Sequence, residues 1–171
     1  MMVSAELRWF WKDAAPPDIT HWFDRGVPAG GGEPRRDRYY PQPGPPELGV
    51  KTRGEGGGKE QVEIKGLVGT RTPQILDPRP GLDLRRVEIW CKWSASVKPE
   101  GPGLLVEKRR RLRKFADGVE EIPLDVDEQP VDRREPLPAG CIIELTKINL
   151  PEQNDTWWTL GFEAFGGLDE V

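Results

Sequence analysis

Alternation of apolar and charged residues is the strongest pattern along this chain. In residues 59–67, KEQVEIKGL, the apolar Val62 and Ile64 alternate with the charged Glu63 and Lys65. Successive side chains of a β-strand point to opposite faces of the sheet, so an acid and a base share one face here. The pattern therefore predicts a strand with one charged face and one apolar face.

Similar segments recur and predict about eight strands. They cover residues 3–11, 37–40, 48–53, 61–68, 85–95, 104–115, 118–128, 140–148 and 155–166, with weaker signals at 37–40 and 118–128. Clusters of Gly and Pro separate them, as expected of turns. After the first strand, PPDITHWFDRG predicts one short helix, with Asp18 as its N-cap, Ile19, Trp22 and Phe23 at helical spacing, and Gly26 at its end.

Short strands joined by short turns are typical of an antiparallel sheet that closes on itself. We expect a mostly β (α+β) fold in a single domain, residues 1–171. Its architecture is an antiparallel β-tunnel, closed or C-shaped, with about eight strands and one or a few short helices. The Gly-rich GEGGGKE at 54–60 joins two strands and lacks a Gly-Lys-Ser/Thr ending, which favours a hairpin loop over a phosphate-binding loop.

Paired charges at strand spacing recur on several of these segments. The pairs are Glu6 with Arg8, Lys51 with Arg53, Glu63 with Lys65, Glu88 with Lys92, and Lys108 with Arg110. One interpretation is a sheet with one face on the core and the other in water. The other is a closed sheet whose charges line a polar tunnel. Buried charges are costly unless they are paired or bind a ligand, and mixed charge suits a polyphosphate with a divalent metal.

Composition narrows the classes of partner. The net charge of −4 argues against a protein that binds nucleic acid through its general surface. No run of 18 apolar residues predicts a membrane span, and the start of the chain resembles no signal peptide, so we expect a cytoplasmic protein. Two cysteines, Cys91 and Cys141, and one histidine, His21, disfavour a zinc site or a Ser-His-Asp triad.

The basic run EKRRRLRKF, residues 107–115, permits two interpretations. It could form a patch for nucleic acid or anionic lipid. Strand alternation instead favours Lys108 and Arg110 pointing inward, with Arg109, Arg111 and Arg113 on a solvated outer face.

In their order, the charged motifs resemble those of the CYTH-like family, the triphosphate tunnel enzymes. That family opens on a Glu-x-Glu-x-Lys strand, which residues 4–8, SAELR, match in part. Its later Lys/Arg-x-Arg, Glu-x-Lys, Lys-x-Arg and Glu-x-Glu strands are matched by residues 51–53, 63–65, 108–110 and 144–146. Each motif is short, but the five follow one another in the family's order over nearly the whole chain.

The resemblance implies a small phosphorylated ligand, with roles for specific residues. The residues that it implies bind phosphate are Arg8, Lys51, Arg53, Lys65, Lys108 and Arg110. Binding of Mg²⁺ or Mn²⁺ falls to Glu6, Glu63 and Glu144. In a metal-dependent triphosphatase, a phosphoanhydride hydrolase, Glu6, Glu144 and Lys65 would be the catalytic residues.

The chain departs from the family pattern at three positions. Ser4 and Thr146 stand where the family has glutamates, and Arg8 stands where it has lysine. Glu63, Glu88 and Glu163 could replace the missing carboxylates in part. The departures indicate a degenerate member of the family, and the segment WWTLGFEAFG at 157–166 resembles a feature of a bacterial subgroup with this fold. The departures leave three functions open: a triphosphatase, a non-catalytic polyanion-binding module that has lost part of the metal site, and a structural β-sandwich with wet charged faces.

Overall fold

Nine strands and one helix make up the computed structural model, which describes residues 2–25, 34–44, 46–56, 60–72, 86–95, 99–116, 120–125, 129–131 and 137–167. The elements are β1 (Met2–Lys12), α1 (Pro17–Asp24), β2 (Arg35–Tyr40), β3 (Leu48–Arg53), β4 (Gln61–Arg71), β5 (Val87–Ala95), β6 (Leu104–Ala116), β7 (Glu120–Ile122), β8 (Gly140–Leu150) and β9 (Asp155–Phe165). Among the described helices, none has the length and apolarity to cross a membrane.

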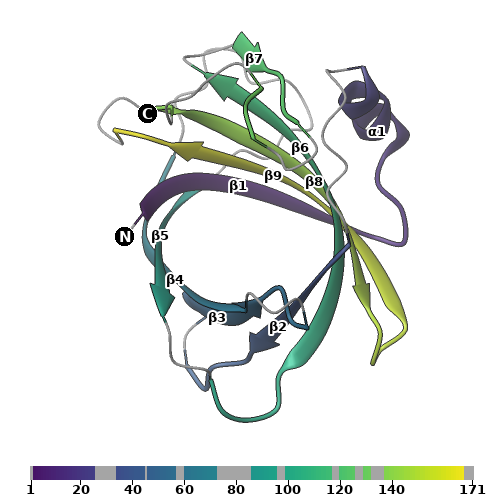
Figure 1. Ribbon diagram of the computed structural model, residues 1–171, viewed down its shortest axis with the longest axis vertical. Coiled ribbons are helices and arrows are strands. Elements are labelled where there is room, and N and C mark those ends of the chain that lie inside the picture. The colour runs from purple at the N-terminus through teal and green to yellow at the C-terminus, as the bar shows by residue number, and fades with distance from the viewer. Residues whose placement is uncertain are drawn as a thin grey trace.

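Eight of the strands close into an antiparallel barrel (Figure 1). The order around the barrel is β2-β3-β4-β5-β1-β9-β8-β6, and pairing of β2 with the first part of β6 completes the ring. The short strand β7 pairs with the last residues of β6 and stands outside the ring. The predicted mostly β fold is therefore confirmed as a closed barrel of eight strands with one extra strand and one short helix.

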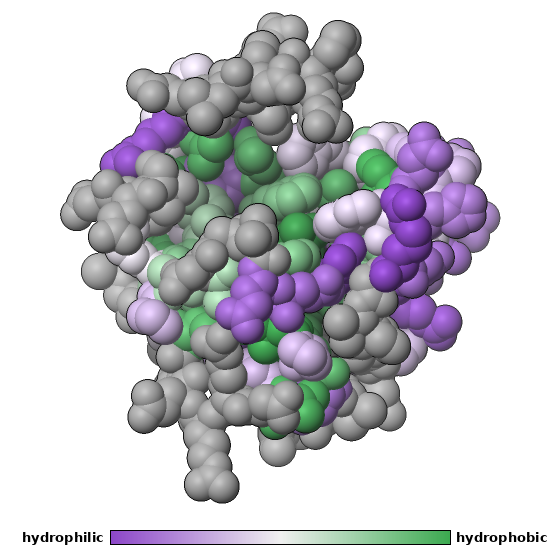
Figure 2. Space-filling view, turned by 90° about the horizontal axis from the view of Figure 1, so that it is seen from above, coloured by the Kyte–Doolittle hydropathy of each residue, from purple (hydrophilic) through white to green (hydrophobic). Residues whose placement is uncertain are grey.

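The main apolar core lies outside the barrel wall, beneath α1. Phe23 of α1 is 1% exposed and packs against Ile143 and Leu145 of β8 and Leu160 of β9. The partly buried side chains that surround this cluster include Trp9, Trp11, Trp22, Phe115, Trp158 and Phe162. Figure 2 shows apolar side chains gathered on the face that carries α1. Because the strands bury their apolar faces outside, period-2 alternation turns the charged faces inward.

Local details correct parts of the sequence analysis. The helix is capped by Pro16 without a side-chain hydrogen bond, so Asp18 is not the N-cap but lies in the first turn, where its charge favours the helix dipole. The predicted end at Gly26 lies outside the described residues. Of the strand expected at 118–128, residues 118, 119 and 126–128 lie outside the described residues. In the described part the strand is Glu120–Ile122, and it ends there because Pro123 has no backbone N–H to continue the ladder.

Two of the three outer arginines of β6, Arg111 and Arg113, are less solvated than expected, whereas Arg109 is exposed as expected. Arg111 pairs with Asp24 of α1, and the Arg113 side chain is only 10% exposed. Arg113 lies over the rings of Trp22 and Phe115 and pairs with Glu121 of β7. These contacts hold α1 and β7 against the barrel, which gives Arg111 and Arg113 a structural role.

Candidate functional site

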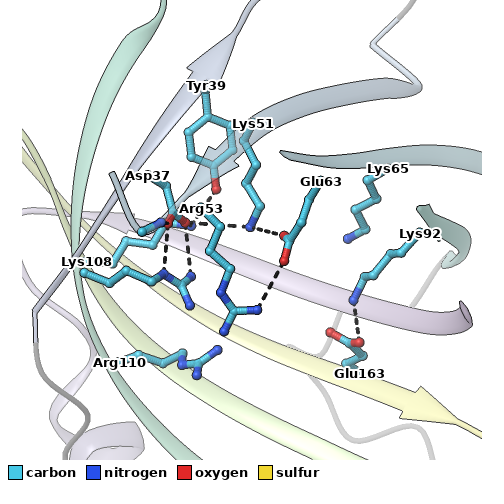
Figure 3. Close-up of polar contacts among 12 residues, drawn as sticks. Asp37, Tyr39, Lys51, Arg53, Glu63, Lys65, Lys92, Lys108, Arg110 and Glu163 are labelled. Atoms are coloured by element: carbon cyan, nitrogen blue, oxygen red, sulfur yellow. Dashed lines mark hydrogen bonds and ion pairs between the residues drawn. The ribbon is translucent and has the colours of Figure 1, made fainter. Parts of the chain in front are cut away.

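Ion pairs between strands that are not neighbours show where the charged faces point. Lys65 of β4 pairs with Glu6 of β1 across β5, and Lys92 of β5 pairs with Glu163 of β9 across β1. Arg8 of β1 reaches Glu144 of β8 across β9, at 3.0 Å. Side chains two strands apart meet in this way on the concave face of a curved sheet. The charged faces therefore point into the barrel (Figure 3).

Asp37 of β2 is the most buried acid of the interior, with no exposed surface. Its carboxylate lies 2.9 Å from Arg35, 3.4 Å from Lys108 and 3.7 Å from Lys51. Burial alone would raise the pKa of Asp37, but the lysines and Arg35 outweigh it and hold the pKa below its usual value. The hydroxyl of Tyr39 lies 2.5 Å from the Lys108 ammonium, which adds a polar group to the same cluster.

Glu63 lies beside this cluster on β4. It faces Lys51 directly across the β3–β4 ladder, and its carboxylate lies 2.8 Å from Lys51 and 3.2 Å from Arg53. Burial opposes ionisation, yet the pKa of Glu63 is lowered because Lys51 and Arg53 both favour its charged form. The expectation that Glu63 points inward opposite Lys51 agrees with this geometry.

A second cluster, of two lysines and two glutamates, lines the wall formed by β4, β5, β1 and β9. Lys65 faces Lys92 in one ladder, and Glu6 faces Glu163 in another. Like charges placed opposite one another are destabilising, so each lysine needs a glutamate from beyond its own ladder. The Glu6 carboxylate forms ion pairs with Lys65 and, at 3.4 Å, with Lys92. It also accepts a hydrogen bond from the Ser4 hydroxyl at 2.7 Å.

The pKa directions in this second cluster follow from burial and charge. Burial lowers the pKa of Lys65, and repulsion from Lys92 and Arg8 adds to it, against the attraction of Glu6. Burial alone would raise the pKa of Glu6, but Lys65 and Lys92 outweigh it and lower the pKa of the carboxyl group. The like-charged neighbour of Lys65 is Lys92, which faces it across the β4–β5 ladder.

The third cluster joins β1, β9 and β8 in one row. Arg8 faces Gly161, and Gly161 faces Glu144. The Glu144 carboxylate lies 3.0 Å from Arg8 and 3.6 Å from Arg110. Burial would raise the pKa of Glu144, but Arg8 and Arg110 lower it to about 2. Glu144 is therefore ionised at neutral pH and already balanced by two guanidinium groups.

Every residue assigned to phosphate binding from the sequence lies in these three clusters, but the sequence analysis missed several partners. The side chains it did not name are Arg35, Asp37 and Tyr39, and Lys92, which it paired with Glu88, was given no role in the site. Alternation in RRDRYY could have placed Arg35, Asp37 and Tyr39 on one face of β2. The interior partner of Lys92 depends on strand order, which the sequence does not display.

The residues expected to bind a metal do not fit a divalent cation. Glu6, Glu63 and Glu144 belong to three different clusters, and each is neutralised by at least two basic side chains. Within the described part of the chain, no three His, Cys, Asp or Glu side chains lie close enough together to bind a metal ion. Carboxylates that are already paired offer little attraction to Mg²⁺ or Mn²⁺. Of the three expected catalytic residues, Glu6 and Lys65 are paired, whereas Glu144 lies with Arg8.

Positive charge exceeds negative charge among the described ion pairs of the interior. Eight bases, Arg8, Arg35, Lys51, Arg53, Lys65, Lys92, Lys108 and Arg110, face five acids, Glu6, Asp37, Glu63, Glu144 and Glu163. The excess is uneven. The second cluster is balanced, whereas four bases on β2, β3 and β6 surround only Asp37 and Glu63.

No protein-family model, curated protein or solved structure matches this chain. The closed barrel and its charged interior are therefore the features on which a functional proposal rests.

Proposed function

We propose that the barrel interior binds a small polyanion, a triphosphate-containing organic or inorganic phosphate, without a resident metal. The observation that carries the proposal is a basic group that converges on the carboxylates of Asp37 and Glu63 inside the barrel. It consists of Lys51, Arg53 and Lys108, which Figure 3 shows, together with Arg35, whose Nε lies 2.9 Å from Asp37. The resemblance to triphosphate tunnel enzymes, based on the order of the charged motifs, supports the same ligand class.

Electrostatics favours an anion at this place. Partly buried cations that outnumber their counter-ions are costly, and a bound anion offsets that cost. The guanidinium groups of Arg53 and Arg110, with side chains 43% and 22% exposed, offer forked donors that match phosphate oxygens. An eight-stranded barrel can hold one small ligand among its inward side chains.

Binding without hydrolysis is the function that this arrangement supports best. Metal-dependent hydrolysis needs carboxylates that gather around a cation. The candidates Glu6, Glu63 and Glu144 are instead held apart by their own basic partners. We therefore place the protein with the non-catalytic polyanion-binding modules among the functions left open by the sequence.

A thermal-shift panel tests this proposal. Inorganic triphosphate, nucleoside triphosphates, thiamine triphosphate and inorganic phosphate are each added to the protein at low salt. A ligand that binds only the folded state raises the melting temperature, and triphosphates are expected to do so more than inorganic phosphate. The absence of any shift at millimolar triphosphate would contradict the proposal.

Two neighbouring arginines provide a matched control. Arg110 points inward to Glu144, whereas Arg109 is exposed on the opposite face of β6. Loss of one charge-assisted contact weakens binding about tenfold, so Arg110→Gln should lower triphosphate affinity by that factor. Arg109→Gln should leave affinity within about twofold, because surface charges are largely screened. Equal effects of the two substitutions would place the anion on the outer surface.

A further inference from the structure

The row Arg8–Gly161–Glu144 supports an inference about the source of positive charge inside the barrel. We infer that the Arg8 guanidinium is a permanent internal cation that stands in place of a divalent metal, positioned by Gly161. The inference rests on the proposed function in so far as the cation serves a bound polyanion. It follows that triphosphate binding by this barrel does not require Mg²⁺ or Mn²⁺.

The position of Arg8 is fixed by two partners, Thr159 on the adjacent strand β9 and Glu144 on β8 beyond it. Its Nη1 atom lies 3.0 Å from a carboxylate oxygen of Glu144 and 3.3 Å from the hydroxyl oxygen of Thr159. The Arg8 side chain remains 32% exposed, so part of the guanidinium can contact a ligand. A guanidinium keeps its charge at every accessible pH and offers five donors in a planar fork, which suits phosphate.

Gly161 provides the space that Arg8 needs to cross β9. A Cβ atom at this position would lie 2.7 Å from Nη2 and 2.8 Å from Cζ of Arg8. The Gly161 φ angle is outside the left-handed range, so the backbone does not require glycine there. The space occupied by the guanidinium is the physical reason for glycine, because any larger residue would displace Arg8 from Glu144.

Two further buried positions on the inward faces of β1 and β8 carry neutral side chains, where carboxylates would attract a metal. Ser4 is fully buried and donates a hydrogen bond to Glu6, and Thr146 of β8 is 1% exposed. The single carboxylate of Glu144 is balanced by Arg8 and, at 3.6 Å, by Arg110. A divalent cation approaching Glu144 would meet two guanidinium groups, and like-charge repulsion would exclude it.

Four proteins test the inference: the wild type, Arg8→Met, Gly161→Ala and Gly49→Ala. Gly161→Ala keeps the Arg8 charge but displaces it, and only a flexible side chain has to move. Gly49 of β3 is the control, because its added Cβ would lie 3.8 Å from the nearest atom, an ordinary contact. Circular dichroism and melting temperature establish that each variant is folded before binding is compared.

Calorimetry with inorganic triphosphate is run in excess EDTA and again in millimolar Mg²⁺. The wild type should bind in EDTA, with equal or weaker affinity in Mg²⁺, because Mg²⁺ neutralises the ligand. Arg8→Met and Gly161→Ala should each lower the affinity for triphosphate about tenfold, and Mg²⁺ should not restore it. The affinity of Gly49→Ala should stay within about twofold of the wild-type value. A tenfold gain of the wild type on adding Mg²⁺ would overturn the inference.

A Mn²⁺ titration without phosphate, followed by electron paramagnetic resonance, separates this inference from the proposed function. The wild type should leave Mn²⁺ free in solution. Mn²⁺ binding that Glu144→Gln abolishes would overturn the internal cation, whatever the triphosphate result. Absence of triphosphate binding in every buffer would instead overturn the proposed function and, with it, the claim that Arg8 serves a ligand.

Discussion

Glu6→Gln separates stability from ligand binding in the barrel interior. Glu6 is 5% exposed and pairs with both Lys65 and Lys92, which face one another across the β4–β5 ladder. Glutamine has nearly the same shape and can still accept the hydrogen bond from Ser4. The substitution therefore removes one negative charge and raises the net positive charge inside the barrel. Among the described residues, it leaves the two facing lysines with Glu163 as their one acidic partner.

The expected loss of stability follows from the burial of these groups. Removing one partner of a buried ion pair costs about 3–5 kcal/mol. The lysine side chains retain 32% and 27% exposure, so water screens part of their repulsion and the lower end applies. We expect a loss of about 3 kcal/mol, or a fall in melting temperature of about 6–12 °C for a domain of this size.

Urea denaturation and triphosphate calorimetry together test this prediction. Stability should fall while triphosphate affinity rises, because the added positive charge favours an anion. Glu88→Gln is the control, since Glu88 is on the same face of the sheet but exposed, and it should change stability by less than about 0.5 kcal/mol. A Glu6→Gln protein as stable as the wild type, or one with weaker triphosphate binding, would refute the reasoning.

Three further predictions concern the interior, pH and the wall. Lys65→Ala should weaken triphosphate binding about tenfold in calorimetry, with a modest loss of stability because Glu6 keeps Lys92; unchanged affinity would remove Lys65 from the site. The pKa of Glu144 is lowered from 4.5 to about 2, so its ionisation should add about 3 kcal/mol to the free energy of unfolding above pH 5. Urea titrations should show this contribution falling as the pH drops toward 2, whereas Glu144→Gln should show a flatter pH profile. Val62→Asp should unfold the domain, as read by circular dichroism, because Val62 is 7% exposed and the new charge would have no partner; a folded variant would mean that this side of β4 tolerates water.

Much of the fold was predictable because period-2 alternation is local. The charged face of Glu63 and Lys65 and the apolar face of Val62 follow from spacing alone, and burial of Val62 agrees with it. The position of α1 was not predictable. It packs on β8 and β9 through contacts of Phe23 with Ile143 and Leu160, and these contacts depend on the tertiary arrangement.

Closure and ion-pair partners could not be derived from the sequence for the same reason. The barrel closes through β2 and β6, whose facing residues Arg35 and Lys108 are far apart in the chain. Asp37 was overlooked although it lies in the expected strand at 37–40, because its partners Lys51 and Lys108 reach it only when β2 pairs with β3 and β6. The Lys65–Glu6 pair spans β5, so it emerges only from the order of strands around the ring.

A crystal structure of the protein with inorganic triphosphate, grown in EDTA, tests the central claim most directly. The account predicts a triphosphate inside the barrel, with its oxygens within hydrogen-bonding distance of Arg53, Lys108 and Arg110, and with the Arg8–Glu144 pair retained. Triphosphate bound only to the outer face of β6, beside Arg109, with the interior ion pairs unchanged and no anion among them, would contradict it.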